Sequence, residues 1–261
     1  MNVGFIGCGN MGSALIRAAA SNKNTRIAVY DKDSEKAKAV AAELGAEVKS
    51  PDVLAGKCDV IFLGTKPNVI PDAAESIRAH VKSGAVVVSM AAGVKLERLS
   101  ELLPDTAIIR IMPNTPAAVG RGMILWCKNA LATRKNEENF LEAIEAAGEL
   151  LMIDEAKIDA GTAVSGCGPA FVYMFIDAMI KGGVEAGLTP EEARLLATTT
   201  VEGAAVMTRL SDRTPEELRI AVCSPGGSTI EGVKSLMNDE LDRIVSTAVG
   251  ASFKRTVELG K

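Results

Sequence analysis

The stretch M-N-V-G-F-I-G-C-G-N-M-G at residues 1–12 decides the fold class of this 261-residue chain. Residues 2–6 form an apolar run typical of a short buried strand, and residues 13–20 have helical character. Between them lies G-x-G-x-x-G, whose glycines allow a tight turn, close approach of a pyrophosphate to the backbone, and packing of the helix on the strand. The stretch therefore predicts a Rossmann-like dinucleotide-binding fold.

The residues that follow strengthen this interpretation, because the glycine motif alone is a weak signal. A second predicted strand, residues 26–30, ends in Asp31, about twenty residues after the loop. A dinucleotide fold places its ribose-binding acid at that position. The alternative is a glycine turn that binds no ligand.

Alternating strands and helices continue to about residue 160. We predict a helix over residues 34–44 and strands over 46–49, 59–64, 84–90 and 107–112, most of them apolar enough to be buried on both faces of a parallel sheet. Ligands of such sheets bind beyond the carboxyl ends of the strands, where this chain has Gly, Pro, Asn, Thr and Lys. The predicted cofactor-binding residues are Gly7, Gly9, Asn10, Met11, Gly12, Asp31, Lys32, Thr65, Lys66, Pro67, Ala91, Ala92, Gly93 and Asn114.

Strand signals stop after two further predicted strands, 122–127 and 150–153, which flank a helix over residues 137–148. Long helices follow over residues 170–186, 190–210 and 241–259, and two Thr-Pro-Glu-Glu segments, beginning at Thr189 and Thr214, are typical helix starts. We therefore predict an α/β fold with an N-terminal Rossmann-like dinucleotide-binding domain, residues 1–160, on a mostly parallel sheet. The second domain, residues 161–261, is predicted to be all-α.

The first helix of the second domain is apolar on most faces over residues 171–180. One interpretation is a core helix packed against the first domain. We favour a homodimer, or a higher homo-oligomer of dimers, in which the helical domains pack together.

Composition excludes some classes of partner. The net charge of −4 and the aromatic content of 3% give neither a basic face nor a stacking platform, so we expect no nucleic-acid partner. We read no signal peptide and no apolar run of membrane-spanning length, and expect no membrane partner. The five cysteines are scattered, without a C-x-x-C pair, which favours a reducing compartment, the cytoplasm, and no structural metal.

The chain has a single histidine, His80, in a predicted helix away from any strand end. It is therefore interpreted as a surface residue, which leaves no Ser-His-Asp or Cys-His machinery and no ordinary zinc site. Cys8, Cys167 and Cys223 lie near predicted turns, where small residues are needed for packing, and we do not predict a nucleophilic role for them. The remaining chemistry is hydride transfer, in which a nicotinamide cofactor carries the reactive group.

A second glycine-rich stretch, V-C-S-P-G-G-S-T-I-E-G at residues 222–232, predicts an anion-binding turn. Pro225 and the glycine pair that follows it force a tight turn, and Ser224, Ser228 and Thr229 supply hydroxyl groups. The following residues can start a helix whose free N–H groups point back into the turn.

Several motifs together resemble those of pyrroline-5-carboxylate reductases. They are G-F-I-G-C-G-N-M-G at residues 4–12, M-A-A-G-V at 90–94, I-R-I-M-P-N-T-P at 109–116, V-S-G-C-G-P-A-F-V-Y at 164–173 and the Ser-Pro-Gly-Gly-Ser-Thr turn. They occur in the expected order through essentially the whole chain, and the turn is the most specific of them.

This resemblance implies reduction of the C=N bond of L-Δ1-pyrroline-5-carboxylate by NADPH or NADH, giving L-proline in the last step of proline synthesis. It also implies that Thr162 lies near the substrate nitrogen, where it could hydrogen-bond or relay a proton. Because the sequence offers no convincing His, Asp or Glu acid, we hypothesise that the imine binds as its protonated iminium. The residues implied to hold the substrate carboxylate are Ser224, Gly226, Gly227, Ser228 and Thr229.

Two features depart from or complicate the family pattern. The family commonly has lysine and aspartate just before the Ser-Pro-Gly-Gly turn, where this chain has Arg219 and Ile220. Asp31 favours NADH because it would repel a 2′-phosphate, whereas Lys32 and Lys36 can compensate and admit NADPH, so the cofactor stays open between the two.

Two other functions are compatible with a glycine loop. A β-hydroxyacid dehydrogenase needs a catalytic lysine four residues after a G-x-G; here that position is Val172, and Lys181 lies more than two turns further on. A non-catalytic NAD(P)-binding regulator has no need of the anion turn and would not turn over the imine.

Overall fold

The computed structural model describes residues 1–259, so the last two residues of the predicted second domain lie outside the described part. The described chain divides into two compact units. Unit 1 comprises Met1–Cys167 and the C-terminal residues from Ser252, and unit 2 comprises Gly168–Ala251.

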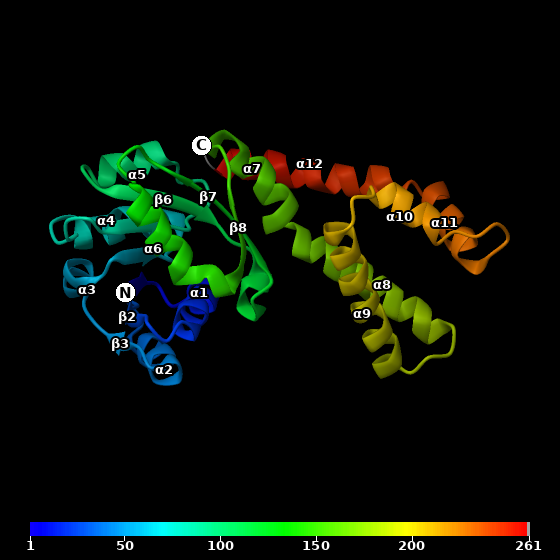
Figure 1. Ribbon diagram of the computed structural model, residues 1–261, viewed down its shortest axis with the longest axis horizontal. Helices are drawn as coiled ribbons and strands as arrows, with labels where there is room; N and C mark the ends of the chain where they lie inside the picture. Colours follow the sequence, from blue (N-terminus) through cyan, green and yellow to red (C-terminus); the bar gives the residue numbers. More distant parts are fainter. Residues whose placement is uncertain (260–261) are drawn as a thin grey trace. The chain divides into compact units, whose positions relative to one another are not determined.

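Unit 1 is built on an eight-stranded sheet with the strand order β3-β2-β1-β4-β5-β6-β7-β8 (Figure 1). Every neighbouring pair is parallel except β6 and β7, which are antiparallel. The prediction of an α/β fold on a mostly parallel sheet is therefore confirmed. The strands are β1 (Asn2–Ile6), β2 (Arg26–Tyr30), β3 (Glu47–Val48), β4 (Val60–Leu63), β5 (Val86–Ser89), β6 (Ala107–Met112), β7 (Gly122–Lys128) and β8 (Gly148–Met152).

Helices cover both faces of this sheet (Figure 1). One face packs against α1 (Asn10–Ser21), α2 (Ser34–Leu44) and α6 (Arg134–Ile144), and the other against α3 (Pro51–Lys57), α4 (Ile70–Arg78) and α5 (Leu96–Leu102). Every residue of β4 and β5 is buried, which explains why these strands read as continuous apolar runs rather than alternating ones.

Aromatic side chains fill the first of these two layers. The rings of Phe5 in β1 and Phe62 in β4 stack with centroids 4.6 Å apart, and Phe140 of α6 lies against Phe62 and Trp126. Burial of such large apolar groups supplies much of the free energy that holds helix to sheet. The loops at the carboxyl ends of the central strands thus stand on a rigid base.

Unit 2 consists of helices. They are α8 (Gly168–Glu185), α9 (Pro190–Leu210), α10 (Pro215–Ala221), α11 (Ser228–Asn238) and the part of α12 (Leu241–Leu259) that precedes Ser252. α8 and α9 pack side by side (Figure 1). Thr189 and Thr214 each form the predicted capping box, with Glu192 and Glu217 respectively.

Apolar side chains remain exposed along α8 of the isolated chain. They include Tyr173, which is 58% exposed, and Met174, which is 73% exposed, with Val172 and Phe175 beside them in sequence. A surface of this kind on one element is typical of a face that another protein chain covers.

The structure corrects the prediction that no apolar run has membrane-spanning length. Residues 155–185 form one helical stretch of 31 residues, and an 18-residue window within it has a mean hydropathy of 1.5, so by length and composition alone it could cross a membrane. α7 (Ile158–Gly161), the π-helix η5 (Thr162–Gly166) and α8 follow each other closely, with only Cys167 between η5 and α8. The expected absence of a membrane partner stays a prediction.

Two helix boundaries also differ from prediction. α6 begins at Arg134 rather than 137, because Thr133 caps it and forms a capping box with Asn136. It ends at Ile144, and Gly148 is already the first residue of β8. At Gly148, φ is 138°, a conformation that glycine adopts readily but other residues do not.

Candidate active site

The strand register brings five strand ends to one edge of the sheet. Ile6 at the end of β1 lies opposite Tyr30 of β2 and Leu63 of β4. Leu63 lies opposite Ser89 of β5, and Ser89 opposite Arg110 of β6. All the residues predicted to bind the cofactor follow these strands, so the structure brings them to the same edge of unit 1.

The glycine loop has the form that a dinucleotide requires. A Cβ atom on Gly7, where φ is 110°, would lie 2.6 Å from the carbonyl oxygen of Gly64, and a Cβ atom on Gly12 would lie 2.2 Å from that of Gly7. A Cβ atom on Gly9 would meet no atom within 4 Å. Gly9 is also the N-cap of α1 and offers no side-chain cap, so the first N–H groups of the helix remain available to an anion.

The loop after β4 contains a buried polar atom with no partner. The hydroxyl oxygen of Thr65 is inaccessible to solvent and forms no hydrogen bond with the described part of the chain. Thr65 directly follows Gly64, which contacts the glycine loop, while Lys66 is exposed and Pro67 begins the short helix Pro67–Val69. An orphaned hydroxyl and open space beside Gly9 fit a bound dinucleotide.

Asp31 is tied to the glycine loop. Its Oδ2 accepts a hydrogen bond of 2.7 Å from the backbone N–H of Cys8, and its Oδ1 accepts one of 3.0 Å from that of Asp33. Burial, together with the negative charge of Asp31, raises the pKa of the Cys8 thiol to about 11. The thiol is therefore protonated at neutral pH and is a poor nucleophile.

The loops after β5 and β6 differ in exposure. Ala91 is buried, Ala92 is exposed, and Gly93 has a φ of 77°. Asn114 is buried, and its Nδ2 donates to the carbonyl oxygen of Ser165 while its Oδ1 accepts from the backbone N–H of Met123, both at 2.9 Å. Asn114 thus joins the end of β6 to the start of β7 and to η5.

Thr162 begins η5 and is buried in unit 1. Its hydroxyl donates a hydrogen bond of 2.7 Å to the carbonyl oxygen of Ile158. The backbone N–H of Cys167 donates to the carbonyl oxygen of Thr162 at 2.9 Å, which is the i to i+5 bond of a π-helix. Single π-turns inside helices are frequent at functional sites.

A buried arginine that sequence reasoning missed anchors the segment before Thr162. The side chain of Arg110 in β6 is 2% exposed; its Nη1 lies 2.9 Å from Oε1 of Glu155, and its Nη2 lies 3.6 Å from Oδ1 of Asp159. Oε1 of Glu155 also accepts from the backbone N–H of Leu96 at 2.7 Å. The only sequence signal was a charged residue inside an otherwise apolar strand.

The predicted anion turn lies in unit 2 and has the expected form. The backbone N–H of Gly227 donates to the carbonyl oxygen of Ser224 at 3.0 Å, and Gly226 has a φ of 71°, as in a type II turn with Pro225 before it. Helix α11 then begins at Ser228 without a side-chain cap. Its first N–H groups and the hydroxyl groups of Ser224, Ser228 and Thr229 are thus gathered by one turn.

Ile220 stands before this turn at the position where the family pattern has an aspartate, so no carboxylate is offered there. Arg219 pairs with Glu216 at 3.4 Å within α10, and Ile220 is 57% exposed.

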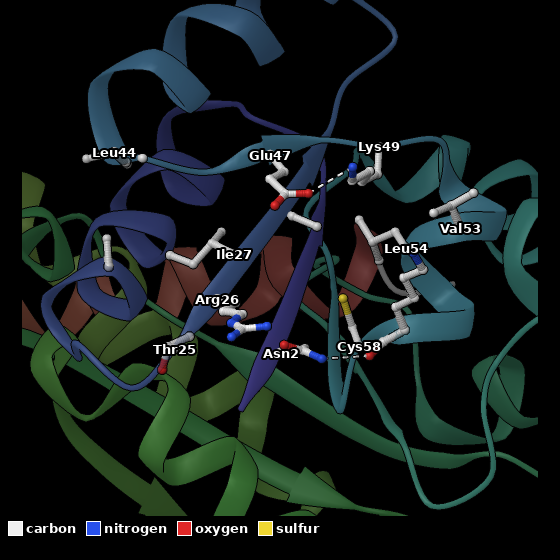
Figure 2. A pocket seen from close by; sticks show the side chains of 14 residues that line it. Asn2, Thr25, Arg26, Ile27, Leu44, Glu47, Lys49, Val53, Leu54 and Cys58 are labelled. Atoms are coloured by element: carbon white, nitrogen blue, oxygen red, sulfur yellow. Dashed lines mark hydrogen bonds and ion pairs between the residues drawn. The ribbon is translucent and has the colours of Figure 1, made fainter.

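A cleft of about 490 Å³ in unit 1 does not coincide with the predicted cofactor edge. As Figure 2 shows, Asn2, Arg26 and Ile27 line it, together with Glu47 and Lys49, which form an ion pair. Asn2 and Arg26 begin β1 and β2, whereas the glycine loop follows the carboxyl end of β1. The cleft therefore lies at the opposite edge of the sheet.

His80 is exposed, as expected of a surface residue. Within residues 1–259, no three side chains of His, Cys, Asp or Glu gather where they could hold a metal ion.

Comparisons with known proteins agree with this geometry. Residues 155–259 match the family model described as pyrroline-5-carboxylate reductase dimerisation, and residues 2–93 match the model described as NADP oxidoreductase, coenzyme F420-dependent. The first match includes α8, whose apolar side chains are exposed in the isolated chain. It supports the prediction of homo-oligomerisation.

Relatives that match nearly the whole chain include several pyrroline-5-carboxylate reductases. Pyrroline-5-carboxylate reductases of Arabidopsis thaliana and Escherichia coli are each 35% identical to the chain, over 99% of it and over 95% and 98% of their own lengths. The structure of a Coxiella burnetii pyrroline-5-carboxylate reductase matches this chain with a TM-score of 0.91 at 29% sequence identity. The structure of the Plasmodium falciparum enzyme with NADP bound matches with a TM-score of 0.89, also at 29% identity. Each match covers 100% of this chain and 98% of the solved chain. The chain therefore belongs to the pyrroline-5-carboxylate reductase family.

Proposed function

We propose that this chain reduces the C=N bond of L-Δ1-pyrroline-5-carboxylate to L-proline with NAD(P)H, the last step of proline biosynthesis. The observation that carries the proposal is the turn from Ser224 to Gly227, which opens onto the uncapped start of α11. Free N–H groups at a helix start bind anions, so in a chain that also has a dinucleotide-binding loop this turn suits a substrate that is a small carboxylate. Family membership supports the same reaction.

The residues at the carboxyl edge of the sheet bind the cofactor in this proposal. NAD(P)H, when bound, supplies the hydride. The open side of Gly9 and the free N–H groups of α1 support pyrophosphate binding by the glycine loop. The proposed cofactor-binding residues are Gly7, Gly9, Asn10, Met11, Gly12, Asp31, Lys32, Thr65, Lys66, Pro67, Ala91, Ala92, Gly93 and Asn114.

The turn of unit 2 holds the substrate carboxylate. Charge-assisted hydrogen bonds to a carboxylate are about twice as strong as neutral ones, so a few donors orient a small ring. The proposed donors are the backbone and hydroxyl groups of Ser224, Gly226, Gly227, Ser228 and Thr229.

Thr162 acts at the substrate nitrogen. Because its hydroxyl proton is committed to the carbonyl oxygen of Ile158, the lone pairs of the oxygen are free to accept an N–H. An acceptor at this position suits a protonated iminium, which already activates the carbon for hydride attack. The hydroxyl then holds the nitrogen in place rather than supplying the proton.

We further propose a domain boundary near residue 160. The family match that begins at residue 155 and the compact unit that begins at Gly168 support it. The proposed assembly is a homodimer, or a higher oligomer of dimers, in the cytoplasm, without a nucleic-acid or membrane partner.

A spectrophotometric assay of NADH and NADPH oxidation tests the proposal. We expect turnover of pyrroline-5-carboxylate with at least one cofactor, and a much larger KM for 1-pyrroline, which lacks the carboxylate. Equal kcat/KM for the two imines would contradict the role of the turn. No oxidation of either cofactor would contradict the function itself.

A further inference from the structure

We propose that this chain binds NADH in preference to NADPH, because the loop after β2 presents fixed carboxylates where a 2′-phosphate would have to lie. The inference rests on the proposed function and narrows its cofactor. It concerns residues 31–36, which are the loop after β2 and the first turn of α2 and are here called the loop.

The carboxylate of Asp31 is held in place by the backbone. Its two oxygens accept hydrogen bonds from the N–H groups of Cys8, at 2.7 Å, and Asp33, at 3.0 Å. Cys8 belongs to the glycine loop, so Asp31 stands beside the element that binds the pyrophosphate and next to the adenosine ribose. Each oxygen keeps a lone pair for a ribose hydroxyl, which is a hydrogen-bond donor.

Three backbone donors of this loop are already used. Oδ1 of Asp33 accepts from the backbone N–H groups of Glu35, at 3.2 Å, and Lys36, at 3.3 Å, and so caps the first turn of α2. The N–H of Asp33 is in turn bonded to Asp31. A phosphate arriving here meets two carboxylates, which already hold these three N–H groups.

The two lysines of the loop do not give it a net positive charge that would attract a 2′-phosphate. Residues 31–36, D-K-D-S-E-K, carry three carboxylates and two ammonium groups. Glu35 is paired with Lys38 at 2.8 Å, outside the loop, which leaves Lys32 and Lys36 against Asp31 and Asp33. A 2′-phosphate adds up to two negative charges to this nearly neutral set, whereas a 2′-hydroxyl adds none.

Calorimetric titration of the full-length protein with NADH and with NADPH, without substrate, tests the inference directly. We expect the Kd for NADPH to exceed that for NADH by about 10-fold or more at low salt. The variant Asp31→Asn keeps an oxygen for the N–H of Cys8 and removes the charge. It should lower the Kd ratio, the Kd for NADPH divided by that for NADH, by about 10-fold. Glu35→Gln removes the same charge from a carboxylate turned towards Lys38 and should leave the ratio nearly unchanged.

The result separates this inference from the proposed function. A wild-type protein that binds NADPH as tightly as NADH overturns the inference, as does an Asp31→Asn variant with an unchanged Kd ratio. Preferential binding of NADH without turnover of pyrroline-5-carboxylate leaves the inference standing and overturns the function. Binding of neither cofactor overturns both.

Discussion

The side-chain amide of Asn114 donates a 2.9 Å hydrogen bond to the carbonyl oxygen of Ser165. This bond fixes the π-helix that begins at Thr162 to the end of β6. Arg110, within β6 itself, fixes the preceding segment through Glu155. Two polar contacts, one with β6 and one with the loop that follows it, therefore hold the segment that carries the Thr162 hydroxyl.

Removal of the Asn114 side chain tests this arrangement. Asn114→Ala should lower the free energy of unfolding by about 2 kcal/mol, because two buried hydrogen bonds are lost. It should also weaken cofactor binding and lower kcat/KM. The matched control is Asn129→Ala, since the Asn129 amide bonds Thr106 and Ile108 at the other end of β6. A similar loss of stability in both variants, with activity lost only in the first, is the expected result; equal activities would contradict it.

Thr162→Val removes the hydroxyl while keeping the shape of the side chain. We expect kcat/KM to fall at least about 10-fold and its pH dependence to change, because the iminium loses an acceptor. Thr162→Ser, which keeps the hydroxyl, should restore most of the rate. An unchanged rate and pH profile in the valine variant would remove Thr162 from the mechanism.

Gly226→Ala tests the anion turn. The φ of 71° at this position costs a residue with a Cβ atom about 1 kcal/mol, so the turn should distort. We expect KM for pyrroline-5-carboxylate to rise several-fold, with the Kd of the cofactor unchanged. Gly232→Ala in α11 is the control, because its Cβ would meet no atom within 4 Å of the chain. Equal KM values for the two variants would argue against a carboxylate site in the turn.

The buried thiol of Cys58 predicts a pH dependence of stability. Burial and the neighbouring Asp59 raise its pKa from 9.0 to about 12. Below pH 9 the thiol is neutral in both the folded and the unfolded chain. Above pH 9 the unfolded chain releases the proton while the folded chain keeps it, so stability should fall by up to about 1.4 kcal/mol per pH unit towards pH 12.

Urea unfolding of wild type and Cys58→Ala at pH 8, 9.5 and 10.5, at one protein concentration, checks this. The smaller side chain of Cys58→Ala lowers the free energy of unfolding by the same amount at each pH. The informative quantity is therefore how steeply the free energy of unfolding changes with pH in each protein. Parallel pH dependence in the two proteins would contradict the raised pKa.

The sequence predicted the parts of the fold that depend on local pattern. The bounds of β1, β2 and β6 agree with those expected, because each strand is apolar and followed by residues that cannot continue it. The turn at Ser224 was equally readable, because proline and glycine restrict the backbone in ways that do not depend on the rest of the fold.

The parts that depend on distant contacts were not predictable. The π-helix at Thr162 is joined to Asn114, 51 positions from Ser165, and Arg110 finds Glu155 45 positions away. The helical stretch that precedes residue 170 was not predicted either. Equally, Asp31 was identified as the ribose acid, but its bond to Cys8 appears only in three dimensions.

The most direct test of the whole account is the stoichiometry of product formation. The purified protein is incubated with pyrroline-5-carboxylate and NADH, and then with NADPH, and L-proline and oxidised cofactor are both quantified. We expect one L-proline for each cofactor oxidised, formed faster with NADH at subsaturating concentrations. Binding of the cofactor without formation of L-proline would contradict it.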